Sequence, residues 1–595
     1  MNFFGPILQR ELFTLPRRGR HYVLRFVYLA GLWVLTVTAW QASRGWGRTV
    51  SPKEVADFGA FLFQLLAWLQ LTLVLFFAAL TAAAAVAMEK DRRTMVLLLC
   101  TDLSNAEIVL GKLLGSLAQI GLLLLSGLPI QAMLLLLGGV SWTQIVVVFV
   151  VLCVSALAAG ALGNLIAFWR EKTFQTLALT VLVLVLYFLL VEALRLVVYL
   201  TAGQPLVARI VGHAQNWLNP YRAMAQILLP QHSESWAAFS VVPFALTMLA
   251  WVTVLSGLAV WKLRVWNPSG EPIQQREAPE EEDVAEPSPA VTQPGPVREV
   301  WSNPVLWREL CTRSYGRRPL LIKAAYLLVA GLIAFAAWQN LPAGPQQSAD
   351  RLLPALGIVP VLVLALLLIN AQGVTAITYE RDLNSLDLLL VTDITPKEFT
   401  FGKLLGVLYN TKEIALPTFL LAIAYAWAGY ISLEVLIYTL IATAVLVAFA
   451  AMLGLHVGLH NVSTRAAIAY SLGTIFFLFV GTLVCIYLLL VAGRIEAQFT
   501  SFLLFLALGI GGMWFVLGGR KPSLALFISS WLCPVGLFYA VVNVLVDNPY
   551  TGTSGDPLLS FLVTVGGFGF TIAAMLVPLL SEFEVALWYS TPAEE

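Results

Sequence analysis

Charged residues are scarce in this sequence of 595 residues. Asp, Glu, Lys and Arg together make up 12% of it, about half the share found in an average soluble domain. That leaves too little polar surface to cover a water-soluble fold, so a soluble globular protein is excluded. The net charge of +1 gives no bulk excess of one sign, and the composition therefore does not indicate nucleic acid as a partner.

Cysteines and catalytic motifs are few or missing as well. The five cysteines are odd in number and no two have metal-ligand spacing, which argues against a disulfide framework and a metal site. No G-x-x-x-x-G-K-[ST] phosphate loop occurs, so the chain lacks the usual backbone cradle for ATP. No Ser-His-Asp order or paired-carboxylate spacing suggests an active site. We expect a non-enzyme that itself binds no cofactor or metal.

Long apolar runs fill most of the chain. A helix needs about 20 apolar residues to cross a membrane, and such runs recur six times in each half. The first half has Tyr22–Trp40, Phe61–Met88, Leu113–Leu137, Ile145–Phe168, Leu177–Leu200 and Val241–Trp261; the second has Leu320–Trp338, Leu353–Ile377, Leu404–Ala428, Leu433–His456, Ile468–Val491 and Leu558–Leu580. Because the runs are continuously apolar rather than alternating, they predict helices and not a barrel. The predicted class is an all-α polytopic membrane protein with twelve transmembrane helices.

An insertion in the second half leaves a second interpretation open. An apolar run at Phe499–Leu517 is followed by the basic pair Arg520 and Lys521, and then by a second apolar run at Leu524–Val546. The two runs form either a re-entrant hairpin on the outer side or two further spans, which would give fourteen in all. We favour twelve, while the basic pair supports fourteen.

The placement of basic residues predicts the orientation. Lys and Arg gather before the first span of each half and in the loops after the second, fourth and sixth spans. They include Arg10, Arg17, Arg18, Arg20, Lys90, Arg92 and Arg93 in the first half and Arg308, Arg313, Arg317, Arg318 and Arg381 in the second. By the positive-inside rule these segments and both termini are cytoplasmic. Both halves then run in the same direction, as parallel repeats in the cell (inner or plasma) membrane.

One segment is not membrane in character. Residues 267–300 are rich in Pro and acid, a composition that buries too little apolar surface to fold. We interpret it as a disordered cytoplasmic linker. It divides the chain into a first repeat at residues 1–266 and a second repeat at residues 301–595.

A cytoplasmic loop is repeated almost unchanged. Glu89–Gly115 reads EKDRRTMVLLLCTDLSNAEIVLGKLLG and Glu380–Gly406 reads ERDLNSLDLLLVTDITPKEFTFGKLLG, without a gap and at an offset of 291 residues. The acid, the Leu triplet, the Thr-Asp pair, a second Glu and the closing Gly-Lys-Leu-Leu-Gly coincide. The chain therefore consists of two fused copies of one membrane unit.

Each loop carries a helix start and a short apolar segment. Ser104 with Glu107, and Thr395 with Glu398, have the spacing of capping boxes and predict a new helix after each. Before them, Met95–Leu99 and the matching second segment, Leu386–Leu390, are apolar and flanked by charge. Such a segment suits the grip of a soluble partner. The alternative is a tight connecting loop that has no partner.

A short amphipathic helix precedes the first span of each half. Asn303 is a predicted cap and Pro304 a first helical residue, and Arg-Glu-Leu recurs with Glu309 aligned to Glu11. The helix is either an ordinary membrane-surface anchor or a docking element for a partner.

The order of these features resembles the ABC type-2 permease family, the membrane subunits of ATP-driven exporters. Asn219 and Pro220 before the sixth span resemble the family's external Asn-Pro motif, whereas the second half has Cys533 and Pro534. In that family the loop after the second span is the coupling element that sits in a cleft of the ATPase. The resemblance implies separate cytoplasmic ABC ATPase subunits, two of them, which bind the ATP.

The resemblance also implies a set of ATPase-docking residues. They are Glu89, Leu98, Leu99, Thr101, Asp102, Glu107 and Lys112 in the first loop and Glu380, Leu389, Leu390, Thr392, Asp393, Glu398 and Lys403 in the second.

Charges inside the apolar runs are candidates for a substrate path. Lys412 and Glu413 lie in the third run of the second half, where the first half has Gly121 and Leu122, and intramembrane charge is a functional hypothesis by default. Glu192 and Arg195 lie one helical turn apart, so they are predicted to pair or to reach the outer interface.

Three functions fit the sequence. The favoured one is the permease subunit of an ABC exporter, driven by ATP hydrolysed on separate subunits. An ion-coupled secondary transporter also uses parallel repeats, and a non-transporting membrane scaffold would recruit a soluble protein through the same loops. The sequence does not indicate the substrate.

Overall fold

The computed structural model of the chain describes residues 5–14, 19–44, 51–91, 94–170, 173–195, 198, 204–228, 234–267, 301–311, 319–339, 352–382, 392–461, 464–481, 499–519, 522–545 and 556–590. Within these ranges every regular element is a helix and no strand occurs. Eleven of the described helices are long and apolar enough to cross a membrane. The predicted all-α polytopic class is therefore confirmed.

The first half contains α1 (Pro6–Thr14), α2 (Gly19–Arg44), α3 (Pro52–Asp91), α4 (Thr94–Leu99), α5 (Asn105–Leu137), α6 (Trp142–Trp169), α7 (Thr173–Ala193), α9 (Pro205–Leu218), α10 (Pro220–Leu228) and α11 (Glu234–Trp266). The second half contains α12 (Pro304–Cys311), α13 (Pro319–Gln339), α14 (Leu352–Asp382), α16 (Pro396–Asn410), α17 (Lys412–Trp427), α18 (Leu433–His460), α19 (Thr464–Phe476), the π-helical turn η2 (Phe477–Gly481), α21 (Phe499–Gly518), α22 (Leu524–Leu545) and α23 (Pro557–Ser590). Asn267 closes α11, and the rest of the predicted linker lies outside the described residues.

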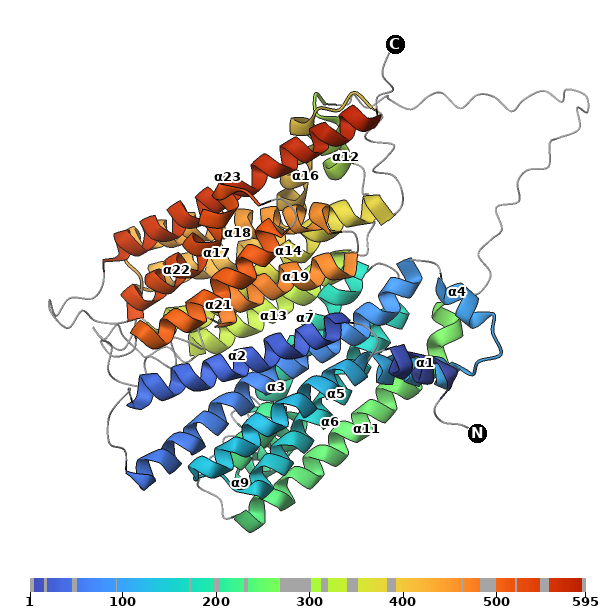
Figure 1. The fold of residues 1–595 in the computed structure, drawn as a ribbon, viewed down its shortest axis with the longest axis vertical. Coiled ribbons are helices and arrows are strands. Elements are labelled where there is room, and N and C mark those ends of the chain that lie inside the picture. The colour runs from blue at the N-terminus through green and yellow to red at the C-terminus, as the bar shows by residue number, and fades with distance from the viewer. Residues whose placement is uncertain are drawn as a thin grey trace, which may run out of the picture.

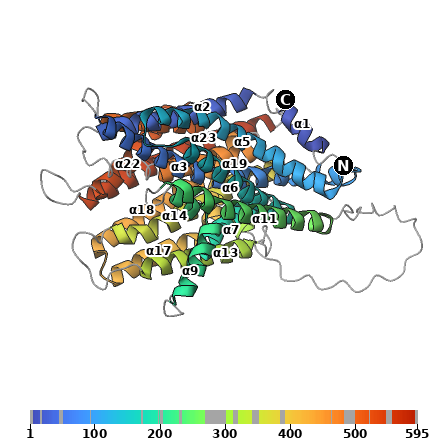
Figure 2. The ribbon, with the colours of Figure 1, turned by 90° about the horizontal axis from the view of Figure 1, so that it is seen from below.

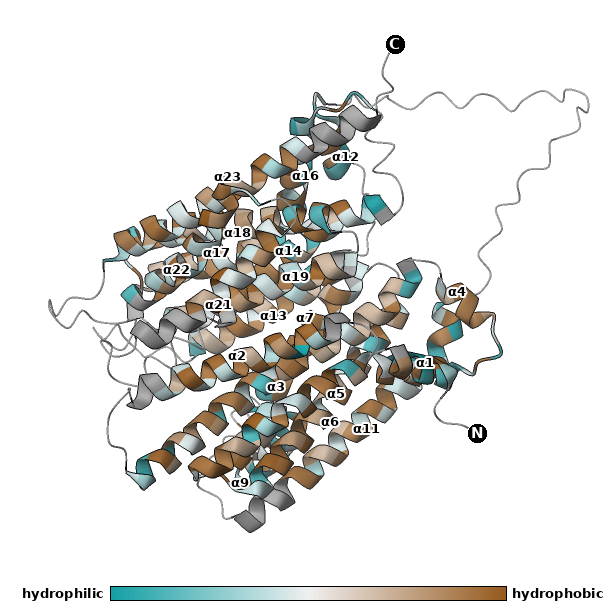
Figure 3. Cartoon of the chain, viewed as in Figure 1, coloured by the Kyte–Doolittle hydropathy of each residue, from teal (hydrophilic) through white to brown (hydrophobic). Residues whose placement is uncertain are grey.

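The helices form two bundles that lie side by side (Figure 1). Seen from below, most of them run roughly parallel, with α9 leaning out of the bundle (Figure 2). Apolar residues dominate along the long helices, and hydrophilic residues concentrate at α1, α12 and several helix ends (Figure 3). The elements α1, α4, α12 and α16 lie at one end of the assembly, which we name the loop end (Figure 1).

Equivalent helices pack together in the two halves. The second span packs on the fourth in both, α3 on α6 and α14 on α18. Gly163 of α6 and Gly454 of α18, which are 291 residues apart, each lie against the partner helix with no room for a Cβ atom. Small residues at such contacts let two helix backbones approach closely. These shared contacts support the predicted repeat.

The two halves touch through a few helices. In the middle of the assembly α7 packs against α13 and α14, and α2 packs against α21. Phe76 of α3 stacks on Phe476 of α19 with ring centroids 5.0 Å apart. The contact between the halves is therefore made by apolar faces of spans.

The third span of the second half is broken, whereas the sequence predicts one continuous run at Leu404–Ala428. Helix α16 ends at Asn410 and α17 begins at Lys412, with Thr411 between them at φ −107° and ψ 6°. The Thr411 hydroxyl donates to the carbonyl of Val407 at 2.8 Å, a bond that bends helices. Pro417 one and a half turns later removes a further backbone bond.

The insertion in the second half reaches the loop end. Nε2 of His456 in α18 lies 3.1 Å from the carbonyl oxygen of Leu517, near the end of α21. That part of α18 lies at the loop end, because Arg381 at the end of α14 donates to the carbonyl of Gly458. Helix α21, which has 20 residues, therefore ends at the loop end, and α22 begins there. This geometry supports the fourteen-span alternative over the favoured twelve.

Candidate functional site

Both predicted capping boxes are present at the loop end. The Ser104 and Thr395 hydroxyls accept hydrogen bonds from the amides of Glu107 and Glu398 at 3.3 Å, and the two carboxylates accept from the Ser104 and Thr395 amides. These bonds begin α5 and α16. The amide and hydroxyl of Thr395 stabilise the charged form of Glu398 and lower the pKa of that carboxyl below its ordinary value of 4.5.

The apolar segment of the first loop forms the six-residue helix α4. Met95 and Leu99 are buried in the core, Leu98 is half-buried against it, and Leu97 is 68% exposed. The outward-facing side chain is thus Leu97, which the sequence did not single out. Leu97, Leu98 and Leu99 cannot be distinguished in the sequence. Only the orientation of α4 on the bundle shows which of them faces outward.

The exposed pairs after the apolar segments lie beside the caps. Thr101 and Asp102 are exposed, as are Thr392 and Asp393. The Thr101 hydroxyl donates to the carbonyl of Leu98 at 2.6 Å and so fixes the turn after α4. The second apolar segment, Leu386–Leu390, with the predicted docking residues Leu389 and Leu390, lies outside the described residues.

The two glycines of each Gly-Lys-Leu-Leu-Gly motif hold the amphipathic helix. A Cβ atom added to Gly111 of α5 would lie 3.1 Å from Cβ of Ile7 in α1, and one added to Gly115 would lie 3.1 Å from Cγ of Glu11. In the second half, Gly402 and Gly406 of α16 face Val305 and Glu309 of α12, as close as 3.0 and 2.8 Å. The motif therefore provides a smooth groove in which a helix can lie.

The predicted cap at Asn303 is confirmed and ties α12 to α16. Its side-chain oxygen accepts from the Leu306 amide at 2.9 Å, and its amide group donates to the carbonyl of Glu398 at 2.9 Å. One side chain thus begins α12 and binds the first turn of α16.

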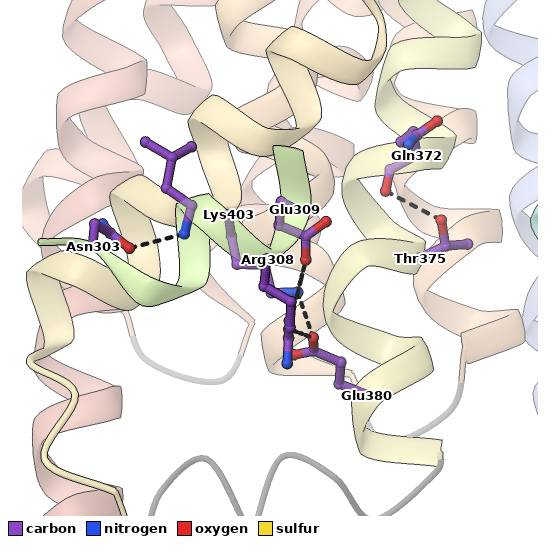
Figure 4. Close-up of polar contacts among 8 residues, drawn as sticks. Asn303, Arg308, Glu309, Gln372, Thr375, Glu380 and Lys403 are labelled. Atoms are coloured by element: carbon purple, nitrogen blue, oxygen red, sulfur yellow. Dashed lines mark hydrogen bonds and ion pairs between the residues drawn. The ribbon is translucent and has the colours of Figure 1, made fainter. Parts of the chain in front are cut away.

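A buried ion cluster joins three elements in the second half (Figure 4). Nζ of Lys403 in α16 lies 2.6 Å from a carboxylate oxygen of Glu309 in α12 and 2.6 Å from one of Glu380 in α14. Arg308 pairs with both acids. The Lys403 side chain is only 2% exposed. A charge at that depth is stable only when it is paired, so α12, α14 and α16 are held in one arrangement.

The first half has a smaller version of this cluster. Lys112 of α5 pairs with Glu89 at the end of α3, and both side chains are mostly buried. Glu11 of α1 lies against Gly115, as Glu309 lies against Gly406. Of the residues that the sequence assigned to docking, Glu89 and Lys112 in the first half and Glu380 and Lys403 in the second therefore pair inside the chain in this structure.

A cation at the end of each second span binds the end of the fourth. Lys90 donates to the carbonyls of Phe168 and Arg170 at 2.5 and 3.0 Å, and Arg381, its equivalent at an offset of 291, donates to the carbonyl of Gly458 at 3.2 Å. These bonds satisfy carbonyls that lack partners at the ends of α6 and α18. The loop end of each half is therefore a connected unit of polar contacts.

Residues 30–268 match the family model described as ABC-2 family transporter protein. This part of the chain is therefore similar to the ABC-2 family. The matched range runs from within α2 to the end of α11 and includes the first loop with α4. No curated protein matches the chain.

The Asn-Pro motif of the first half organises the end opposite the loops. Glu192 near the end of α7 accepts from Arg222 through two bonds of 2.7 Å and from Asn219 at 2.8 Å. The sequence predicts that Glu192 pairs with Arg195. In the structure the main partner of Glu192 is Arg222, which α10 brings closer. Helix α7 ends at Ala193, and Leu200, where the predicted span ends, lies outside the described residues.

The charges proposed for a substrate path lie on α17, which packs within the second half. Glu413 pairs with Lys323 of α13 at 2.8 Å, and Nζ of Lys412 lies 3.6 Å from the ring centroid of Tyr409. Helix α17, which carries both, packs on α13, α14 and α18 of its own half. A place for Lys412 and Glu413 in a substrate path remains a prediction.

Phe76 and Phe476 are the residues that sequence reasoning missed at the contact between the halves. Phe77 is close as well, with its ring centroid 6.2 Å from that of Phe476. Position 476 falls in the fifth run and position 76 in the second, and neither stands out among the 33 phenylalanines. Only the packing of α3 on α19 brings the two rings together.

Proposed function

We propose that this chain is the membrane permease of an ABC exporter, with ATP bound and hydrolysed on separate cytoplasmic ATPase subunits. The family match of residues 30–268, which contain the first loop, carries this proposal. The loop end is then the cytoplasmic side, in agreement with the positive-inside pattern. Multi-pass helices place the chain in the membrane.

Helix α4 is the proposed contact for an ATPase subunit. It presents Leu97 outward while Met95 and Leu99 hold it on the bundle. A movement of α4 would reach α3 directly, because the two are in contact. It would reach α5 through the turn closed by Ser104 and Glu107. The repeated loop in the second half is the proposed contact for a second subunit.

The ion clusters hold the helices around each loop rigidly together, so that a movement of the loop is transmitted to the membrane spans. In the second half, Lys403 fixes α16 to α12 and α14, so a push on the loop turns these helices together instead of bending one of them. The halves meet through apolar faces such as Phe76 on Phe476, which can slide without breaking an ion pair. Tilting of one half against the other is therefore the proposed transport movement.

The test is a single substitution on the exposed side of α4. Leu97→Asp is expected to abolish co-purification of an ABC ATPase, because a charge there removes the apolar contact without entering the core. The control is Leu12→Asp, which changes another exposed leucine, on α1. Both variants are expected to reach the membrane in wild-type amounts.

Two results would contradict the proposal. One is full retention of the ATPase by the Leu97→Asp variant. The other is transport by the purified chain in liposomes under an ion gradient with no ATPase present, which would instead establish a secondary transporter.

A further inference from the structure

We propose that the second half binds one anionic phospholipid between α13 and α17, with Lys412 on its headgroup. The site is separate from the loops and from the contact between the halves. The assignment of this site to the cytoplasmic leaflet rests on the orientation proposed above. The lipid binding itself does not depend on the transport function.

Three charged side chains meet on this surface and leave one positive charge in excess. Glu413 is neutralised by Lys323 at 2.8 Å. Lys412 is exposed, and its ammonium lies over the Tyr409 ring at 3.6 Å, a contact that holds a cation in place without neutralising it. Two lysines and one glutamate give this surface a net charge of +1, which attracts an anion.

The depth of this cluster is that of the lipid headgroups. Lys323 is the second residue of the apolar span Ile322–Gln339. Helix α17 starts at Lys412 and has 16 residues, about 24 Å at 1.5 Å per residue, which crosses most of a hydrocarbon core of about 30 Å. Trp427 at its far end is 93% exposed, as expected for a residue at the opposite interface. The break at Thr411 therefore lies where α17 enters the membrane.

An apolar surface suited to acyl chains continues from the charges. Leu416 and Leu420 follow Lys412 at intervals of four residues, so the three side chains share one face of α17. Both leucines are exposed, and so is Leu327, which follows Lys323 by four residues on α13. A headgroup phosphate at Lys412 would place its chains along these leucines. Basic residues beside apolar helices in the cytoplasmic leaflet attract anionic lipid.

The first half does not offer the same site. Gly121 and Leu122 stand at the positions that match Lys412 and Glu413, although Arg25 matches Lys323. One bound anionic lipid per chain is therefore expected.

The experiment measures phosphatidylglycerol retained by the purified full chain. The chain is reconstituted in nanodiscs made of equal amounts of phosphatidylcholine and phosphatidylglycerol, extracted in mild detergent, and analysed by mass spectrometry. Lys412→Gln is expected to lower the retained phosphatidylglycerol about fivefold, the effect of one lysine near a headgroup. Lys397→Gln, which removes an exposed charge fifteen residues away on α16, is the matched control and is expected to retain it.

A charge series separates lipid binding from a loss of local structure. Lys323→Gln alone leaves no net charge and is expected to lose the lipid. Lys323→Gln combined with Glu413→Gln removes the ion pair between α13 and α17 but restores the net charge of +1, so it is expected to retain the lipid. Loss in the double variant together with retention in Lys412→Gln would overturn the proposal.

The source of the phosphate group is tested in the same preparation. Inorganic phosphate added to the detergent sample is expected to leave the bound phosphatidylglycerol in place, because it lacks acyl chains to contact Leu416 and Leu420. Complete displacement by inorganic phosphate would mean that the site takes a free anion and would overturn the lipid assignment.

Discussion

At the residue scale, the charged groups of the repeated loop act inside the chain. Lys403 lies 94 residues from Glu309 and 23 from Glu380 in sequence, yet the three side chains meet where none is more than 10% exposed. Such a cluster is costly to form and costlier to break, because removing one partner leaves an uncompensated buried charge. Its effect is to fix one arrangement of α12, α14 and α16.

The buried lysine gives a prediction with a magnitude. Lys403→Met is expected to destabilise the second half by about 3–5 kcal/mol, because Glu309 and Glu380 lose a shared cation. Lys112→Met is expected to cost less, because that lysine pairs with one acid in a less buried place. Thermal unfolding of the purified chain, followed by tryptophan fluorescence, measures both. Lys403→Arg keeps the charge and serves as control; equal stability of Lys403→Met and wild type would refute the structural role of the cluster.

At the scale of elements, the Gly-Lys-Leu-Leu-Gly motif is a contact between two helices. Its glycines receive α1 in one half and α12 in the other, and its lysine lies on the same face toward the acids. The sequence placed this motif at the start of the third span and assigned its lysine to a partner. In the structure the glycines serve as packing contacts. From the sequence alone, such a glycine looks the same as one that breaks a helix or makes it flexible.

Two glycine substitutions separate packing from flexibility. In Gly406→Ala the new Cβ would lie 2.8 Å from Cβ of Glu309, so α12 has to shift, and a loss of about 1–3 kcal/mol is expected from overpacking. Gly121→Ala in α5 meets nothing within 4 Å and is expected to gain about 0.5–1 kcal/mol from helix propensity. The midpoint of thermal unfolding reports both signs. A stabilising Gly406→Ala would contradict the close contact of α12 with α16.

At the scale of the whole molecule, the two halves are related but not equal. The Asn-Pro group with Arg222 and Glu192 belongs to the first half, and the second half has α21 and α22 at the corresponding place in the chain order. Helix α21 also packs on α2. The insertion thus adds to the contact between the halves.

The depth of the insertion is tested by accessibility. In a cysteine-free background, Ser523→Cys, between α21 and α22, is expected to react with a membrane-impermeant thiol reagent from the cytoplasmic side alone. Asp556→Cys, before α23, is the control and is expected to react from outside. Labelling at position 523 only from outside would restore the re-entrant hairpin and the count of twelve spans.

The sequence by itself determined what depends on neighbouring residues. Apolar runs established the helical membrane class, because every backbone group in lipid must be paired within a helix or a barrel. The capping boxes at Ser104 and Thr395 were predicted correctly, because their partners lie three residues away. The order of loop, cap and glycine motif pointed to the family that the match over residues 30–268 supports.

The tertiary structure decided everything that depends on which helices become neighbours. It pairs Glu192 with Arg222 rather than the nearby Arg195, and it stacks Phe76 on a ring from the other half. It also turns Leu97 outward while burying Met95 and Leu99. Periodicity gives the faces of a helix, but the face that is covered depends on packing and on close contacts such as those at glycines. For that reason the loop was found in the sequence, and the side chains that hold it were found only in the fold.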